Sequence, residues 1–456
     1  MPNDIAANTT NKDVKVRFAP SPTGMLHVGN ARTALISWLF TRSNHGTFLL
    51  RIDDTDVERS KKEYEDAIIE SLTWLGMDWD ETARQCDRLE RYSECIEKLK
   101  ADGRIYACYE TSEELALKRK VLLNRGLPPI YDRAALEVTD EQKAAFEAAD
   151  RKPHWRFKLN HTPIGWTDEV RGEVSFQGGD LSDPVVIREN GTPLYHLCSV
   201  IDDVDYAITH IIRGEDHVSN TATHIQMFEA LGATPPKFAH LPLLSDSEGG
   251  KLSKRLGSLS VFDIRDDDGL EAMAVVSLMA RLGTSDPIEA YTDIAPLIKS
   301  CDFSKFGRGT PKFDPNELFR LNKKILQVTD FDAVKDRINI EGMDEEFWNS
   351  IRQNLSKLSD AGEWWSVINV PVTPVIDDEE FIEVAASLLP SAPWDENTWG
   401  QWTSAIKEKT DRKGKMLFMP LRLALTGMQH GPELAVLLPL IGADSALNRL
   451  RTKKAA

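Results

Sequence analysis

Short apolar runs alternate with longer stretches of helical periodicity over the first third of the chain. The runs VKVRF and GTFLLRI predict strands at 14–18 and 46–52. Apolar residues that recur every three or four positions predict helices at 31–42, 60–76 and 89–103. We expect the second helix to be capped by Ser60 and to stop at Gly76. Strands separated by helices predict parallel pairing and a doubly wound α/β sheet.

The pattern changes between residues 108 and 190. A basic helical pattern at 112–126 leads to the strand-like segments HWRFKL and GEVSF at 154–159 and 172–176, which together predict an inserted lobe. The strand and helix alternation then resumes, with a helix expected at 220–232.

From about Val328 onward almost every segment has helical periodicity, which predicts an all-α region. Six of the eleven tryptophans lie in this region. We expect them to pack helix against helix; they are Trp348, Trp364, Trp365, Trp394, Trp399 and Trp402.

Length and composition narrow the class of protein. A chain of 456 residues with 41% hydrophobic and 28% charged residues is typical of a globular protein of several domains. No apolar run reaches membrane-spanning length, and the N-terminus lacks the basic start and apolar core of a secretory signal, so we expect a cytoplasmic protein. The five cysteines form no CxxC pair, which is typical of free thiols.

The net charge of −17 argues mildly against nucleic acid as a partner, because phosphate binding needs local positive charge. Net charge is a sum, however, and a basic groove can lie on an acidic body. Composition alone therefore decides little about the partner.

The stretch RFAPSPTGMLHVGNARTAL, residues 17–35, indicates an anion site. A strand that runs through a tight loop into a helix presents free backbone N–H groups where an anion can bind. Pro20 and Pro22 stiffen the loop, Gly24 and Gly29 allow a ligand close to the backbone, and His27 adds a donor. The alternative is a proline-rich turn whose histidine only caps the helix; the whole run together favours phosphate chemistry without a P-loop.

A second motif, KLSKR, places Lys251, Ser253 and Lys254 on a glycine-rich loop. In a reaction that releases pyrophosphate from ATP, lysines on such a loop can stabilise the charge that builds on the leaving phosphates. Two lysines alone are a weak signal, because charged loops are usually only solvated. The motif becomes specific when it is paired with the first one.

The two motifs resemble the signatures of the class I aminoacyl-tRNA synthetases. HVGN resembles the HIGH tetrapeptide and KLSKR resembles KMSKS. The flanking segments RIDDTD, TPLYHLCSVIDD, IIRGEDHVSNT and FMPLRLALTG are similar to bacterial glutamyl-tRNA synthetases over nearly the whole chain. The loop reads SPTG, where the glutaminyl branch usually has EPNG.

The resemblance implies a Rossmann-type doubly wound catalytic domain with an inserted α+β lobe, followed by an all-α anticodon-binding region. The expected boundaries divide the chain into five parts. They are the first catalytic half (1–107), the acceptor-stem lobe (108–190), the second catalytic half with the KLSKR loop (191–260), a helical stem-contact domain (261–327) and the anticodon domain (328–456). A monomer is the family default, and the sequence leaves the oligomeric state open.

Site residues follow by position in the family motifs. The implied ATP-binding residues are Pro20, Thr23, Gly24, His27, Gly29, Asn30, Asp216, Lys251, Ser253 and Lys254. The implied glutamate-binding residues are Arg17, Ala19, Ser21, Asp53, Tyr195, Ser199 and Arg213. Two of these assignments, Arg17 and Arg213, also follow from the residues themselves. Each arginine ends a predicted strand, and a planar guanidinium binds a carboxylate through two parallel hydrogen bonds.

The sequence departs from the family pattern at two places. Asp53 stands where the family usually has Glu, so either the pocket is reshaped or a water bridges the gap to the substrate ammonium. Many relatives carry a zinc site in the inserted lobe; here Cys108 and Tyr131 match it, but Glu110 and Ala135 replace two cysteines. One thiolate and one phenol cannot close a tetrahedral site, so we expect no structural zinc and no other metal site in the protein.

Basic residues gather in three segments that are plausible phosphate contacts along an RNA. Our tRNA-binding candidates are Lys118, Arg119 and Arg125 in the lobe and Lys413, Lys415 and Arg422 near the C-terminus. The last residues add Arg449 and Arg451. The alternative for each segment is a solvated helix face.

The expected function is that of a glutamate–tRNA ligase whose substrates are L-glutamate, ATP with Mg²⁺, and tRNA-Glu. Positioning and charge stabilisation by His27, Lys251, Lys254 and Mg²⁺ would carry the catalysis. Whether tRNA-Gln is also charged is left open.

Three alternative functions fit the sequence less well. A truncated relative that glutamylates a tRNA base would lack the long helical region after Val328, and a small nucleotidylyltransferase would be far shorter. A catalytically inactive RNA-binding module would be expected to have lost His27 or Lys254, and both are present.

Overall fold

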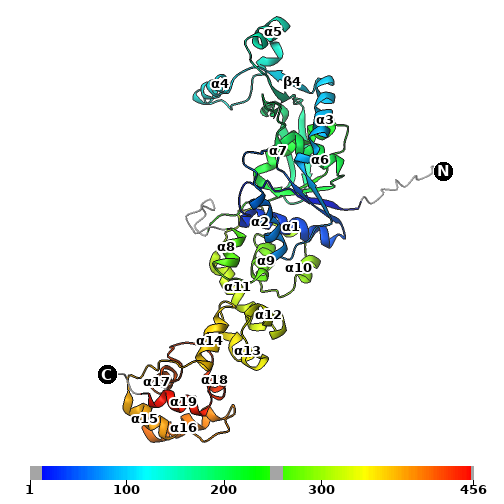
Figure 1. The fold of residues 1–456 in the computed structure, drawn as a ribbon. Helices are drawn as coiled ribbons and strands as arrows, with labels where there is room; N and C mark the ends of the chain where they lie inside the picture. The colour runs from blue at the N-terminus through cyan, green and yellow to red at the C-terminus, as the bar shows by residue number, and fades with distance from the viewer. Residues whose placement is uncertain (1–12, 247–259, 453–456) are drawn as a thin grey trace, which may run out of the picture. The chain divides into compact units, whose positions relative to one another are not determined.

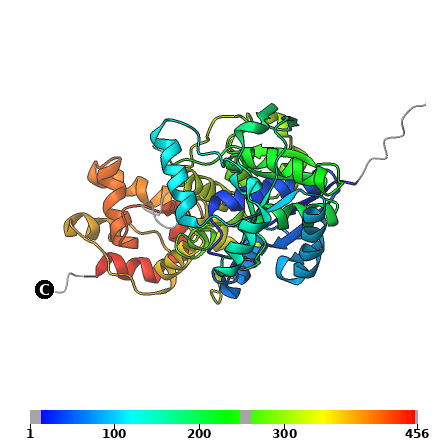
Figure 2. The ribbon, with the colours of Figure 1, turned by 90° about the horizontal axis from the view of Figure 1, so that it is seen from above.

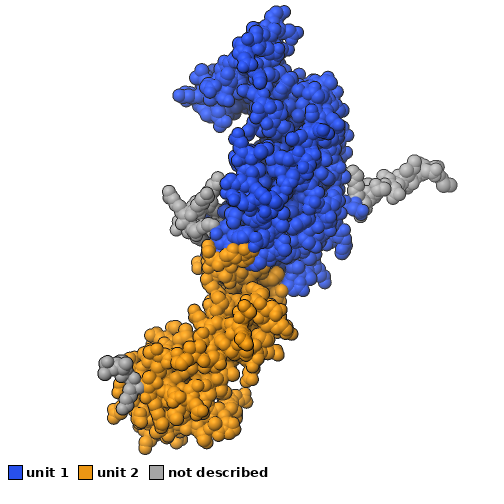
Figure 3. Space-filling view, viewed as in Figure 1, with its two compact units in different colours: residues 1–264, 276–288, 293–314 blue, residues 265–275, 289–292, 315–456 orange. Residues whose placement is uncertain are grey.

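The structure is a computed structural model that describes residues 13–246 and 260–452. The chain divides into two compact units, shown in different colours in Figure 3. Unit 1 comprises residues 1–264, 276–288 and 293–314, and unit 2 comprises residues 265–275, 289–292 and 315–456.

A seven-stranded sheet of order β3-β2-β1-β9-β10-β6-β7 forms the centre of unit 1. Its strands are β1 (Lys15–Phe18), β2 (Thr47–Ile52), β3 (Glu81–Arg84), β6 (Pro163–Asp168), β7 (Gly172–Gln177), β9 (His210–Gly214) and β10 (Lys237–Leu241). Every neighbouring pair is parallel except β6 and β7. The predicted doubly wound parallel sheet is therefore confirmed.

The chain builds this sheet outward from β1 in both directions. It runs from β1 to β2 and β3 on one side and later returns to add β9 and β10 on the other side of β1. The loops that leave β1 and β9 therefore diverge, which opens a crevice at the carboxyl ends of these two strands.

Helices cover the sheet, as Figures 1 and 2 show. Helix α1 (Val28–Ser43) packs on β1, β2 and β9. Helices α3 (Leu89–Ala101), α6 (Tyr195–Asp205) and α7 (Val218–Ala230) share a hydrophobic core with Leu49 of β2, Ile211 of β9 and Phe238 of β10. The crevice thus lies between the start of α1 and the helix pair α6 and α7.

One local prediction differs from the structure. Helix α2 (Lys62–Trp74) begins after Lys61, and the hydroxyl of Ser60, expected to cap it, has no partner among the described residues. Helix α3 begins at Leu89, as predicted, and the Leu89 side chain is 51% exposed there. Gly76 does follow α2 with a φ of 78°, a left-handed conformation that glycine adopts without strain.

The lobe contains a separate antiparallel sheet of order β4-β5-β8. Its strands are β4 (Ile105–Cys108), β5 (His154–Phe157) and β8 (Val185–Ile187), and its helices are α4 (Ser112–Asn124) and α5 (Asp140–Ala148). Capping boxes on Thr111 and Thr139 start the two helices.

Two strands within residues 108–190 do not join the lobe sheet. Strands β6 and β7 extend the large sheet, where Asp168 of β6 pairs with Phe238 of β10. The GEVSF segment, expected as a lobe strand, is therefore an edge strand of the large sheet. Its alternation of exposed and half-buried residues fits either location, because a strand pattern carries no information about its partner.

The remaining helices follow the large sheet in the sequence. They are α8 (Val261–Asp266), α9 (Ala272–Arg281), α10 (Ala295–Lys299), α11 (Pro315–Val328), α12 (Lys335–Ile338), α13 (Glu345–Ile351), α14 (Asp360–Asn369), α15 (Glu379–Ser387), α16 (Thr398–Thr410), α17 (Lys415–Thr426), α18 (Leu434–Ile441) and α19 (Ala443–Arg451). Trp348, Trp364 and Trp402 are buried in one core of unit 2, as predicted. Within the described ranges, no helix is long and apolar enough to span a membrane.

Candidate active site

A cavity of about 470 Å³ lies at the carboxyl ends of β1, β9 and β10, at the crevice described above. Ten of the predicted site residues line it: Arg17, Ala19, Pro20, Ser21, Thr23, Gly29, Asn30, Tyr195, Arg213 and Asp216. Four others do not: Gly24, His27, Asp53 and Ser199. Lys251, Ser253 and Lys254 lie outside the described residues. The topology thus collects in one cavity residues that are up to about 200 positions apart in the sequence.

Strand geometry explains why three arginines converge there. Successive side chains of a strand point to opposite faces, so Arg51 lies on the same face of β2 as the core residue Leu49. Likewise Arg213 shares the face of Ile211 on β9, and Arg17 is paired in register with Leu49. All three guanidinium groups therefore reach the side of the sheet that α6 and α7 cover.

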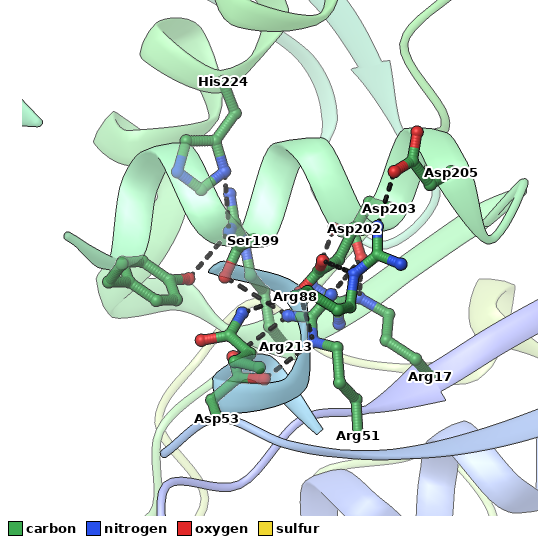
Figure 4. Close-up of polar contacts among 12 residues, drawn as sticks. Arg17, Arg51, Asp53, Arg88, Ser199, Asp202, Asp203, Asp205, Arg213 and His224 are labelled. Carbon is green, nitrogen blue, oxygen red and sulfur yellow. Dashed lines mark hydrogen bonds and ion pairs between the residues drawn. The ribbon is translucent and has the colours of Figure 1, made fainter. Parts of the chain in front are cut away.

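Figure 4 shows the ion-pair network that binds two of these arginines. Arg17 donates to Asp203 of α6 through Nε at 3.0 Å and Nη2 at 3.3 Å. Arg51 donates through Nη1 to the same Asp203 at 2.8 Å and through Nε to Asp53 at 2.6 Å. These side chains are at most 7% exposed, so the pairing offsets the cost of burying their charges.

Asp53, expected to meet the substrate ammonium, is bound on both oxygens by Arg51, at 2.6 Å and 3.0 Å. Burial raises the pKa of Asp53, and the neighbouring Arg51 opposes that shift. The shorter aspartate side chain is therefore held on its own strand and does not line the cavity.

Arg51 was missed by the sequence analysis, although it is fully buried and bonds Asp53, Asp203 and Ser199. The signal was available in the run GTFLLRI, where period-two alternation places Arg51 on the face of Leu49. A buried arginine at a strand end needs acidic partners; one is Asp53, two residues on, and the other is Asp203 of α6, about 150 residues away.

Arg32 of α1 is a second missed cation. It is 2% exposed, lines the cavity, and donates to the carbonyl oxygens of Pro242 and Leu282, each at 2.9 Å. Burial lowers the pKa of Arg32 to about 10. Because it remains charged at neutral pH, it adds positive potential to the cavity wall.

His27 caps α1. Its Nδ1 accepts a hydrogen bond from the backbone N–H of Gly29 at 3.3 Å. Burial lowers the pKa of His27, which keeps the ring neutral at pH 7. Since Nδ1 must present its lone pair, Nε2 carries the proton and can donate it to an anion.

The four positions of the relatives' zinc site do come together. The Sγ of Cys108 lies 3.6 Å from Glu110 Oε2 and 3.5 Å from the hydroxyl of Tyr131. Tyr131 in turn contacts Glu110 at 2.5 Å and accepts from the N–H of Ala135 at 3.0 Å. The ammonium of Lys118 lies 2.5 Å from Glu110, so a lysine charge is already present in the cluster.

The candidate RNA contacts differ in their exposure and in whether they already form ion pairs. Arg119, Arg125, Lys413 and Lys415 are exposed. Lys118 is committed to ion pairs with Glu110 and Asp132.

Two further arginines proposed as phosphate contacts form hydrogen bonds to backbone carbonyls of unit 2. Arg422 donates to the carbonyl of Pro432 at 2.7 Å. Arg449 is 6% exposed and donates to the carbonyls of Leu425 and Val367, so the interpretation of Arg449 as a phosphate contact was wrong.

Comparisons with known proteins agree with this geometry. The family described as tRNA synthetases class I (E and Q), catalytic domain, matches residues 13–318, and an anticodon binding domain matches residues 377–453. A glutamate–tRNA ligase of Azospirillum brasilense is 56% identical over 440 residues, and glutamate–tRNA ligase 1 of Maricaulis maris is 55% identical over 438 residues. Each alignment covers 96% of this chain and 98% of the relative.

A solved structure of a glutamate tRNA ligase also matches this chain, at lower sequence identity. The crystal structure of a glutamate tRNA ligase from Elizabethkingia meningosepticum, in complex with its amino acid, matches with a TM-score of 0.84 at 27% identity. The match covers 96% of this chain and 98% of that one. By sequence and by fold, the chain belongs to the class I tRNA synthetases for glutamate and glutamine.

Proposed function

We propose that the chain is a glutamate–tRNA ligase, which activates L-glutamate with ATP and transfers it to the 3′ end of tRNA-Glu. The observation that supports this proposal most directly is Arg213. Its guanidinium is buried in the cavity wall, and no carboxylate within residues 13–246 and 260–452 bonds to it. A buried cation that lines a cavity and has no acidic partner favours a ligand that carries a carboxylate there.

The amino acid binds with its side-chain carboxylate toward Arg213 and Tyr195. Arg17 uses Nε and Nη2 on Asp203, which leaves Nη1 to face the cavity. Asp53 does not line the cavity, and we therefore assign its contact with the substrate ammonium to a bridging water.

ATP, bound as its Mg²⁺ complex, occupies the part of the cavity beside α1. The loop of Pro20 and Thr23 and the backbone at Gly29 and Asn30 approach the nucleotide, and Nε2 of His27 donates to its phosphates. The α-carboxylate of glutamate attacks the α-phosphate, which gives glutamyl-adenylate and pyrophosphate. Lys251 and Lys254 stabilise the charge on the leaving pyrophosphate.

The second step transfers the glutamyl group to a ribose hydroxyl at the 3′ end of the tRNA, and AMP leaves. The exposed Arg119 and Arg125 contact RNA from the lobe, and Lys413 and Lys415 do so from unit 2. A ligase that glutamylates a base within a tRNA would lack the anticodon domain, which residues 377–453 match here.

Charging assays test the proposal. Purified protein is incubated with ATP, Mg²⁺ and labelled glutamate, with tRNA-Glu or tRNA-Gln added separately. We expect labelled tRNA-Glu; failure to charge it, with a positive-control synthetase active on the same RNA, would refute the proposal. The tRNA-Gln arm decides whether the enzyme discriminates between the two tRNAs.

A further inference from the structure

The hydrogen-bond partners of Arg213 within the described residues are all neutral groups. Its Nη2 donates to the hydroxyl of Thr221 at 2.6 Å and to the carbonyl of His217 at 3.4 Å. Its Nε donates to Nε2 of His240 at 3.3 Å, and its Nη1 to Nδ1 of His224 at 3.3 Å and the hydroxyl of Tyr195 at 3.4 Å. Arg17 and Arg51 differ, because both bond carboxylates of the network in Figure 4.

The donor-only character of Arg213 determines the tautomer of His240. A guanidinium can only donate, so Nε2 of His240 must present its lone pair and the proton must lie on Nδ1. Nδ1 lies 2.5 Å from Asp168, which three backbone N–H groups hold in place, those of Val170, Arg171 and His240 itself. Asp168, at the end of β6, thus orients the ring that faces Arg213 while that ring separates the two charges.

The same argument applies to His224 of α7. Its Nδ1 accepts from Arg213, so its proton lies on Nε2, which is 2.9 Å from Nδ1 of His196. Burial lowers the pKa of His224 and of His240, which keeps both rings neutral and able to accept. Neither His224 nor His240 therefore directs an N–H proton at the Arg213 guanidinium.

We propose that Thr221 and His240, the latter oriented by Asp168, are positioning residues for amino-acid selection: they hold the Arg213 guanidinium with neutral acceptors and leave its charge unpaired for the side-chain carboxylate of the substrate. The proposal rests on the proposed function of this site. It adds that the preference for glutamate depends on groups that do not touch the amino acid.

The shortest contact, from Arg213 to Thr221, gives the first test. Thr221→Val keeps the shape of the side chain and removes the acceptor. We expect the KM for glutamate to rise about tenfold and kcat to change less than about twofold, the pattern of a lost binding contact worth one charged hydrogen bond. The KM for ATP should stay within about twofold, which a general disruption of the fold would not allow.

Two further variants control this test. Thr221→Ser restores a hydroxyl and should recover the KM for glutamate. Thr223→Val makes the same change at another buried threonine of α7 that contacts neither Arg213 nor the cavity, and it should leave selection unchanged. An unchanged KM in Thr221→Val, or an equal rise in Thr223→Val, would overturn the positioning role.

A second pair of variants tests the charge. Thr221→Asp places a carboxylate against Arg213, and Thr221→Asn places a neutral group of the same shape there. We expect kcat/KM for glutamate to fall about a hundredfold further in the aspartate variant than in the asparagine variant, while kcat/KM for glutamine, measured in the same assay, changes equally in both. Equal losses with glutamate would show that the unpaired charge is not what selects the substrate.

The wild-type charging reaction, run in the same assay, separates this proposal from the proposed function. If the wild-type protein fails to charge tRNA-Glu, the function itself is wrong. If it charges normally and the Thr221 variants behave like Thr223→Val, only the inference about Thr221 and His240 falls.

Discussion

Arginine side chains in this protein have different roles according to what surrounds them. Arg51 is fully buried and bonds the carboxylates of Asp53 and Asp203, so it ties the end of β2 to α6. Arg213, on the same side of the sheet, bonds only neutral groups. The first arrangement holds the site together, and the second leaves a charge available to a ligand.

Replacing Arg51 should therefore destabilise the protein. Arg51→Met leaves Asp53 and Asp203 buried with less compensation, and we expect the free energy of unfolding of unit 1 to fall by about 3–5 kcal/mol. Arg91→Met, which breaks exposed ion pairs to Asp205 and Glu94, is the matched control and should cost less than about 1 kcal/mol. Urea unfolding measures both, and equal losses would contradict the assigned role of Arg51.

His27 combines a structural and a chemical role. His27→Ala removes the cap of α1, at a cost of about 1 kcal/mol, and the donor on Nε2, which should lower the rate of adenylate formation about 10²–10³-fold. His27→Asn supplies a good cap acceptor without an imidazole, so it should restore stability and leave the rate low. A rate that recovers together with the melting temperature would assign His27 to structure alone.

Elements of unit 2 depend on close contacts that only glycine allows. Gly431 lies in the turn between α17 and α18 with a φ of 142°. A Cβ built on it would lie 1.9 Å from the ring of Trp364, a core residue of α14. The turn therefore packs directly on the core, and glycine is required at this position for both backbone and steric reasons.

Gly431→Ala should displace Trp364 and destabilise unit 2 by about 3 kcal/mol or more, by overpacking a core contact and straining the backbone. Gly400→Ala is the control, because Gly400 lies within α16 with open space around it. That change should stabilise the helix by about 0.5–1 kcal/mol. Thermal unfolding followed by tryptophan fluorescence compares the two, and a neutral Gly431→Ala would contradict the packing argument.

The lobe offers an element-scale prediction about metal. Glu110, Tyr131 and Cys108 bond one another, and the Lys118 ammonium beside Glu110 would repel a divalent ion. We expect elemental analysis of the purified protein to find no stoichiometric zinc. One equivalent of zinc per chain, lost in Cys108→Ser, would contradict this prediction.

At the scale of the whole molecule, an acidic chain has to bind an acidic polymer. The net charge is −17, yet Arg119, Arg125, Lys413 and Lys415 are exposed on two different units. Local positive charge on separate units suits an extended RNA.

We expect glutamate activation to require tRNA. Both oxygens of Asp53 bond Arg51 and Asp53 does not line the cavity, so a water-bridged contact holds the substrate ammonium only loosely. RNA binding can supply the free energy that orders this end of the site. The measurement is ATP–pyrophosphate exchange with glutamate, with and without tRNA-Glu. Exchange at full rate without RNA would remove the tRNA-gated step and leave the ligase assignment intact.

The sequence by itself determined the elements, the fold class and most of the cavity. Period-two and helical patterns predicted the parallel sheet and the all-α region, and the motif at residues 17–35 predicted a loop that does line the cavity. These features are local: strand period, proline and glycine conformation and helix starts depend on neighbours along the chain.

Only the tertiary structure decided what each charge contacts. Which sheet β7 joins, the bond from Arg51 to Asp203, and the internal role of Arg449 depend on strand pairing or on residues about 80 to 150 positions away. Sequence patterns report whether a position is polar or apolar, and the free energy of a buried charge depends on what lies within a few ångströms of it. The difference between a paired Arg51 and an unpaired Arg213 therefore emerges only when the strands are brought together.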